Sequence, residues 1–155
     1  MKIIRISLTV KLFNWVKYIA MGKDGSLWGF KCEPYVSKFY QSHGVGWIPS
    51  SVISLCQWFV SGKTMPYFNY MDTLSYIGDK ERNQRFVFDI EVPNDSKYIF
   101  MNQVGSVFVS KNKPIVRKNN DLWICDDATC VLDSRKECKE WKTSLREIKE
   151  CNVVR

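Results

Sequence analysis

The chain has 155 residues, with 45% apolar side chains, 14% aromatic side chains and a formal net charge of +7. An apolar fraction of this size can fill a packed core, so the composition excludes a disordered chain. The basic surplus suits an anionic partner, and it excludes a protein that imitates DNA, because such a mimic needs an acidic surface. Charged and polar residues interrupt the apolar positions of the N-terminus. Neither a signal peptide nor a membrane-spanning segment is therefore expected.

The first predicted element is a strand over residues 5–12, RISLTVKL, in which polar and apolar side chains alternate. Alternation with a period of two is typical of a strand that is buried on one face. Residues 85–92, RFVFDIEV, repeat the same apolar phase at a fixed offset along the chain. The sequence therefore predicts two equivalent half-buried strands.

A β-hairpin is predicted after each of these strands, and the two hairpins resemble each other. Residues 17–36 read KYIAMGKDGSLWGFKCEPYV, and residues 97–116 read KYIFMNQVGSVFVSKNKPIV. Each copy has a glycine, Gly25 or Gly105, between two short apolar runs, where a tight turn needs a residue that accepts positive φ. The chain is therefore predicted to be an internal duplication.

A short Trp-Ile strand follows each hairpin, at residues 47–48 and 123–124, and a helix is predicted after each of them. The first helix would begin at a serine cap in the segment Pro49-Ser50-Ser51 and end before Gly62. Its predicted apolar face consists of Val52, Cys56, Phe59 and Val60. Residues 63–83 then link the two copies, and their many aromatic side chains predict a link that is packed rather than free.

The second predicted helix begins at Asp133 or Ser134 and runs to about Glu150. Apolar residues recur along it at spacings of three and four, which indicates one narrow buried stripe, at Cys138, Trp141, Leu145 and Ile148. Basic residues lie beside that stripe, within roughly 80° of arc on a helix, at Arg135, Lys139, Lys142, Arg146 and Lys149. Such charges often only solvate a helix, but they can also form a basic edge that contacts an anion.

The predicted fold is α+β and internally duplicated, with two antiparallel β-rich halves that are each followed by a helix. The predicted boundaries are 1–80 for the first copy and 81–155 for the second, packed together as one compact unit.

No motif in the sequence predicts a catalytic, cofactor-binding or metal-binding residue. The single histidine, His43, has no motif around it, and Gly44-Val45-Gly46 lacks the further glycine and the helix of a phosphate-binding loop. The six cysteines have no regular spacing for a metal, and reduced thiols are the simpler interpretation. Adjacent carboxylates at Asp126 and Asp127 are more typical of a turn than of acid–base chemistry. We therefore expect a protein that is not an enzyme.

The candidate binding residues are the basic edge of the second helix, together with aromatic residues in the loop after the first hairpin. They are Arg135, Lys139, Lys142, Arg146, Lys149, Tyr35, Phe39 and Tyr40. Phosphate contact and base stacking use these side chains, so direct nucleic-acid binding is one alternative. Sequestration of an anionic nucleotide signal between the two copies is another. Neither alternative has a supporting sequence signature.

The hairpin from Val16 to Pro34, with its KYIAM and DG elements, resembles a hairpin of small bacteriophage accessory proteins of unassigned activity. The resemblance covers under half of the chain, and the second copy departs from it at Phe100, Val104 and Phe108. It implies a phage protein in the cytoplasm of a bacterial host that binds and inhibits or redirects a host macromolecule, including a defence system. A host protein or protein complex is the leading expected partner, without a cofactor and without a membrane.

Overall fold

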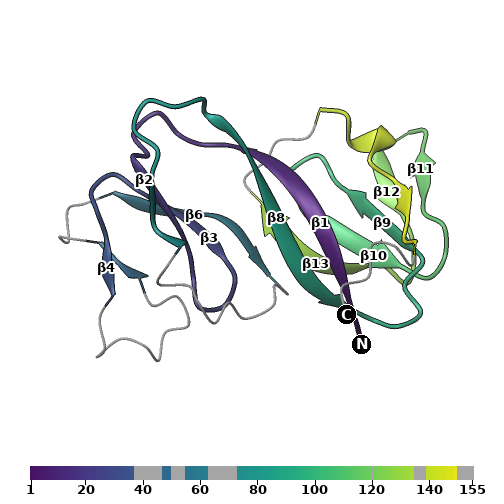
Figure 1. The fold of residues 1–155 in the computed structure, drawn as a ribbon. Coiled ribbons are helices and arrows are strands. Elements are labelled where there is room, and N and C mark those ends of the chain that lie inside the picture. The colour runs from purple at the N-terminus through teal and green to yellow at the C-terminus, as the bar shows by residue number, and fades with distance from the viewer. Residues whose placement is uncertain (37–46, 50–54, 63–72, 120, 135–138, 150–155) are drawn as a thin grey trace.

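The computed structural model describes residues 1–36, 47–49, 55–62, 73–119, 121–134 and 139–149. These residues form a β-rich molecule, shown in Figure 1, and none of them is in an α-helix. The predicted α+β class is therefore wrong. Among the described residues, no helix has the length and apolar character that crossing a bilayer requires.

The same order of seven strands occurs twice along the chain. The first copy contains β1 (Lys2–Lys11), β2 (Tyr18–Met21), β3 (Leu27–Phe30), β4 (Tyr35–Val36), β5 (Trp47–Ile48), β6 (Cys56–Gly62) and β7 (Ser75–Tyr76). The second contains β8 (Asn83–Val92), β9 (Tyr98–Met101), β10 (Val107–Ser110), β11 (Ile115–Arg117), β12 (Leu122–Ile124), β13 (Thr129–Ser134) and β14 (Arg146–Glu147), with a 3-10 helix, η3 (Trp141–Thr143), before its last strand. Strands β2 and β3 form the first predicted hairpin, and β9 and β10 form the second.

The strand pairing relates the two copies by a pseudo-two-fold axis. An eight-stranded sheet has the order β14-β9-β10-β13-β6-β3-β2-β7, so equivalent strands lie at equal distances from its centre. At that centre β6 pairs with β13, and Ser61 lies opposite Asp133. A separate ribbon forms from β1 and β8, and its middle pair is Ser7 and Val87. Both central pairs are antiparallel and join equivalent residues, as a two-fold axis through them requires.

The hydrophobic core lies between the β1–β8 ribbon and the eight-stranded sheet. One face of the ribbon is apolar because every second residue points inward. The core takes Ile4, Leu8 and Val10 from β1, Leu12 from just after β1, and Phe88, Ile90 and Val92 from β8. The sheet contributes residues from its central strands. Figure 1 shows the ribbon crossing the middle of the molecule, with β2 and β3 on one side and β9 and β10 on the other. The ribbon therefore joins the two copies through a shared core.

The first predicted helix is replaced by strand β6 over the part of it that the structure describes; residues 50–54 lie outside that part. Leu27 pairs with Val60 and Trp28 pairs with Trp58, so Phe59 is an extra residue in β6. Such a β-bulge places two successive side chains on the same face, and both Phe59 and Val60 are buried. A strand that contains a bulge loses its period of two, and its apolar spacing then imitates a helix.

The second predicted helix is also wrong, because its region holds the end of β13, the 3-10 helix η3 and the short strand β14. Ser134 is the last residue of β13, is buried, and donates a hydrogen bond from its Oγ to the carbonyl of Gly105 at 2.8 Å. Trp141 is buried, and its ring meets that of Trp123 in an edge-to-face contact with the ring centroids 5.6 Å apart. Of the predicted apolar stripe, Trp141 is buried on η3, whereas Leu145 and Ile148, on either side of β14, are half-buried. Cys138 lies outside the described residues.

Candidate functional site

The predicted basic residues in the described part of the second copy lie on η3, β14 and their flanks. Lys139 is exposed before η3, and Lys149 is exposed after β14. Lys142 donates to Asp121 Oδ1 at 2.6 Å and lies over the ring of Trp141, 5.5 Å from its centroid. Arg146 donates to the carbonyls of Thr143 at 2.6 Å and Leu145 at 2.8 Å. The helix that was expected to align these residues is absent from the described segment, and two of them already bind groups of their own chain.

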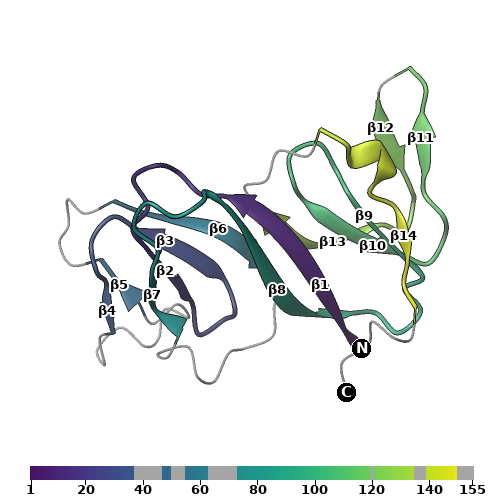
Figure 2. The same cartoon turned by 45° about the horizontal axis from the view of Figure 1, so that its top comes forward.

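The remaining predicted binding residues are only partly described. Tyr35 is exposed on β4, where it pairs with Ile48 of β5. Arg135, Phe39 and Tyr40 lie outside the described residues. The structure therefore places one of the three predicted aromatic residues, at the opposite end of the molecule from η3 (Figure 2).

The β11–β12 hairpin presents an apolar face to solvent. Ile115 pairs with Ile124, and Arg117 pairs with Leu122, so these four side chains share one face of the hairpin. Ile115 is 63% exposed, Leu122 is 53% exposed and Ile124 is 36% exposed. Figure 2 shows this hairpin extending from the body of the molecule. We call the four residues the hairpin face.

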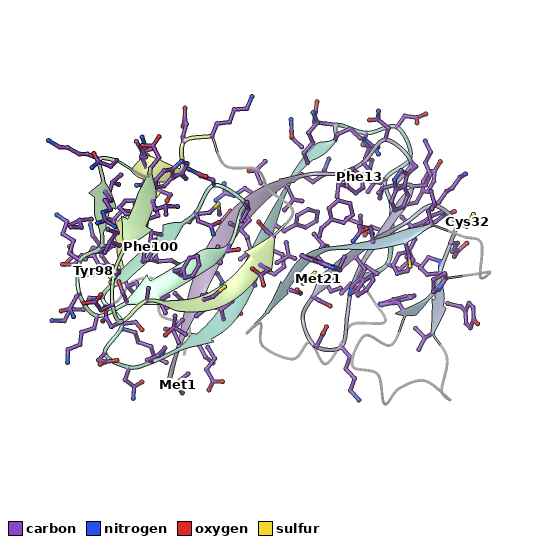
Figure 3. All side chains as sticks on the ribbon, turned by 180° about the vertical axis from the view of Figure 1, so that it is seen from behind. Met1, Phe13, Met21, Cys32, Tyr98 and Phe100 are labelled. Atoms are coloured by element: carbon purple, nitrogen blue, oxygen red, sulfur yellow. The ribbon has the colours of Figure 1, made fainter. Side chains whose placement is uncertain are left out.

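The other face of the same hairpin is fixed to the body of the second copy. Trp123 donates from its indole N–H to the carbonyl of Met101 at 2.9 Å. Its ring lies 5.4 Å from that of Phe100, and Phe100 stacks on Phe108 at 5.6 Å. Figure 3 shows Phe100 at the far end of the molecule from Cys32. Because these aromatic contacts are buried or half-buried, the hairpin face is held in place without a partner.

An apolar hollow of about 200 Å³ lies beside the hairpin, between the β9–β10 turn and Trp141. Trp123 and Trp141 contribute to its wall, and Val104 and Leu122 are its most exposed apolar residues. Gln103 donates from Nε2 to the carbonyl of Asp121 at 3.0 Å, which ties the turn to the start of β12. We call this feature the tryptophan hollow.

The carboxylate of Asp127 has a structural role at a second hollow, of about 210 Å³. Its Oδ2 accepts hydrogen bonds from the backbone N–H groups of Lys111 at 2.8 Å and Asn112 at 3.1 Å. The pKa of Asp127 is lowered, first by the hydrogen bond from the Cys125 thiol and then by these backbone donors. Burial raises the pKa of Cys125, and the bond to Asp127 raises it further, so the thiol is not activated as a nucleophile. Asp127 therefore fixes a turn, as adjacent carboxylates in a loop predict.

Among the described residues, no group of three or more His, Cys, Asp or Glu side chains is arranged so that it could hold a metal ion. Cys32, Cys56 and Cys125 are free thiols. Comparison of the chain with protein families, with curated proteins and with solved structures gave no match. The chemistry of the site therefore has to be argued from its own side chains.

Sequence reasoning missed both the hairpin face and the tryptophan hollow. The available signal was the divergence of the two copies, because Val104 stands where the first copy has Asp24. A valine at a turn tip that stays 69% exposed has no packing role there. The alternation of Ile115, Arg117, Leu122 and Ile124 was also visible, but its meaning depends on the register of two strands only three residues long.

Proposed function

We propose that this protein is a non-enzymatic accessory protein of the phage type that binds a host protein and inhibits or redirects it. The observation that supports this proposal is the hairpin face, an exposed aliphatic surface on a projecting hairpin whose other face is anchored by Trp123. Exposed apolar residues grouped on a rigid element are typical of protein interaction sites. The proposal places the protein in the host cytoplasm and needs no cofactor.

A protein partner suits this surface better than a nucleic acid does. The hairpin face offers aliphatic side chains, whereas binding to single strands depends on aromatic side chains that stack on bases. Of the predicted phosphate contacts, Lys142 and Arg146 already donate hydrogen bonds within the chain. The tryptophan hollow itself is small for a nucleotide, since it measures about 200 Å³, below the range of roughly 300–1,000 Å³ that is common for ligand pockets.

The test is affinity capture from a bacterial lysate, with and without nuclease, read by mass spectrometry. The disrupting variant is Ile115→Glu with Ile124→Lys, because the new charges lie opposite each other and can pair, which keeps the hairpin folded. The control is Val87→Glu, which charges another exposed apolar position, on the outer face of the β1–β8 ribbon.

We expect one host protein to remain bound in stoichiometric amount after nuclease treatment, to the wild type and to Val87→Glu. The hairpin variant should lose it. Loss of every partner from the wild type after nuclease treatment would contradict the proposal and favour nucleic-acid binding. If the hairpin variant retains the same partner, the partner binds a surface other than the hairpin face.

A further inference from the structure

We infer that the link between the two copies, residues 77–82, keeps them paired within one chain as long as its turn is closed, and that Arg82 holds this turn closed. When the link opens, the first copy of one chain pairs with the second copy of another chain, in a domain-swapped dimer. The partner is therefore a second copy of this chain. This pairing is independent of any host protein.

The contacts between the copies do not decide whether both copies come from the same chain. Among the described strands, the copies are joined by the pairing of β1 with β8 and of β6 with β13. A swapped dimer contains each of these pairings twice, once for each pair of copies. The monomer and the swapped dimer therefore share their inter-copy contacts and differ only in the link.

The link is a compact turn. The N–H of Lys80 donates to the carbonyl of Ile77 at 3.0 Å, and Gly78 has a φ of 50°, which residues with a Cβ rarely adopt. A Cβ at Gly78 would also lie 3.1 Å from the ring of Tyr76. A segment of this length reaches roughly 20 Å when it is fully extended. Opening the turn would therefore give the second copy room to leave the first.

The two ends of the link are attached in ways that a swapped dimer can keep. Ile77 is buried, and its N–H donates to the carbonyl of Lys17 at 2.8 Å, so this end belongs to the first copy. At the other end, the carbonyl of Arg82 accepts the N–H of Leu12 at 2.9 Å and extends the pairing of β1 with β8. In a swapped dimer this second attachment is made to another chain. Only the turn between the two ends has to open.

Arg82 stabilises the closed turn by binding carbonyl groups. Its guanidinium donates to the carbonyl of Gly78 at 2.6 Å and to that of Lys80 at 3.0 Å, both within the link. It also donates to the carbonyls of Val16 at 2.8 Å and Phe13 at 3.3 Å, between β1 and β2. Swapping keeps the last two bonds, which accompany the β1–β8 pairing. It breaks the first two, because opening the turn changes the backbone at both carbonyls.

The experiment is refolding of the full chain from urea under reducing conditions, at low and at high protein concentration. Size-exclusion chromatography with light scattering then measures the mass, and each dimer is diluted and followed over several hours. The link variant is Arg82→Met, which keeps a long side chain and removes the donors. The control is Arg85→Met, because Arg85 donates to Ser7 across the β1–β8 ribbon, a contact that the monomer and the swapped dimer share.

A second pair of variants strains a turn and leaves Arg82 in place. Gly78→Ala puts a Cβ at positive φ in the link, and Gly25→Ala does the same in the β2–β3 turn, where φ is 81°. Both variants should destabilise the fold, but only Gly78→Ala acts on the closed link. The comparison therefore separates opening of the link from a general loss of stability.

We expect the wild type, Arg85→Met and Gly25→Ala to refold as monomers, and Arg82→Met and Gly78→Ala to form dimers at high concentration. The dimerisation constant of Arg82→Met should exceed that of the wild type about a hundredfold, because a swapped dimer has lost the bonds of two closed links. These dimers should persist after dilution, since a swapped dimer separates only when its cores open.

Monomeric refolding of both link variants would overturn the inference. Equal dimerisation of the controls, or dimers that dissociate at once on dilution, would overturn it as well. If Arg82→Met does not refold, the comparison of Gly78→Ala with Gly25→Ala decides.

Discussion

The two copies build the same strand pairs with different combinations of side-chain size. Ala20 lies opposite Trp28 in the first hairpin, whereas Phe100 lies opposite Phe108 in the second. One copy thus joins a very small residue to a very large one, and the other joins two residues of medium size. Close packing constrains the combined volume of two facing side chains. It does not determine which of the two strands contributes the larger one.

A second exchange of the same kind occurs at the β-bulges. The extra residue is Phe59 in β6 and Val131 in β13. Gly29 lies against Phe59, and a Cβ at Gly29 would come within 2.7 Å of its Cε2 atom. The position equivalent to Gly29 is Val109, which is buried in the second copy. Glycine with phenylalanine has therefore been exchanged for valine with valine.

Hydrogen bonds are kept where side-chain volumes have changed. Trp47 donates to the carbonyl of Met21 at 2.9 Å, as Trp123 does to that of Met101 at the same distance. The N–H of Met21 donates to Thr73 Oγ1 at 2.9 Å, in the place that Ser144 takes in the second copy. Directional bonds are harder to exchange than apolar contacts, because an unpaired buried polar group is costly and a repacked apolar group is often tolerated.

The largest effect is expected when the size exchange at the bulge is made one residue at a time. Gly29→Val should lower the free energy of unfolding by about 3 kcal/mol through overpacking, and Phe59→Val by about 2 kcal/mol through a cavity. The double variant copies the second half, so its loss should be smaller than the sum by on the order of 1 kcal/mol. Urea unfolding of the three variants measures this coupling, and strictly additive losses would show that the two positions do not compensate.

A smaller and nearly equal effect is expected from removing the shared tryptophan bond in either copy. Trp47→Phe and Trp123→Phe each leave a main-chain carbonyl with one donor fewer and should cost about 1–2 kcal/mol. Thermal unfolding of both variants tests whether the copies depend equally on this bond. If only one of the two variants loses stability, the two hydrogen bonds contribute unequally to stability although their geometry is the same.

Exchanging the turn residues should separate structure from surface. Asp24→Val removes acceptors for the N–H and Oγ of Ser26, so we expect a loss of about 1 kcal/mol. Val104→Asp changes an exposed side chain and should stay within roughly 0.5 kcal/mol of the wild type. Thermal unfolding of both variants measures these differences in stability. A large loss of stability in Val104→Asp would show that this valine has a structural role that its exposure does not suggest.

The smallest effect concerns pH, and it should be confined to one copy. Lys31 donates its N–H to the carbonyl of Leu55 at 3.0 Å, whereas the equivalent Lys111 donates to the carboxylate of Asp127. The folded pKa of Asp127 lies below the ordinary 3.8, so its contribution is complete above that value and is lost as the pH falls through the lowered pKa. Amide hydrogen exchange should be measured at decreasing pH, down to the lowest pH at which the protein stays folded. The backbone N–H of Lys111 should lose protection at a higher pH than that of Lys31. Asp127→Asn should remove that pH dependence, and simultaneous loss at both amides in the wild type would contradict the assignment.

The sequence predicted the elements whose signals are local. Alternation identified β1 and β8, and Gly25 and Gly105 identified the hairpin turns, where their φ values are 81° and 91°. The first helix failed because the bulge at Phe59 breaks the strand period, and a broken period of two resembles one of 3.6. The second failed because its apolar residues lie on a 3-10 turn and around a short strand. Periodicity cannot reveal a bulge, since the extra residue is defined only by the partner strand.

The candidate site was less accessible to sequence reasoning than the fold. The spacing of Lys139, Lys142 and Arg146 suggested a basic edge only because a helix was assumed around Trp141. The hairpin face depends on Ile115 lying opposite Ile124, and the hollow depends on Trp141 reaching Trp123. Both are contacts between segments whose relative position is set by tertiary packing.

The pairing of β1 with β8 has a consequence for how the chain could exist at half its length. A single copy would leave β1 without its strand partner and would expose one edge of β6, because β8 and β13 belong to the other copy. Two identical half-chains could satisfy both edges only by assembling as a symmetric dimer, and their folding would then depend on protein concentration. Joining the copies in one chain removes that dependence through a high effective concentration. It also frees each copy to change its sequence alone, so a surface such as the rim at Val104 can arise on one side without being imposed on the other.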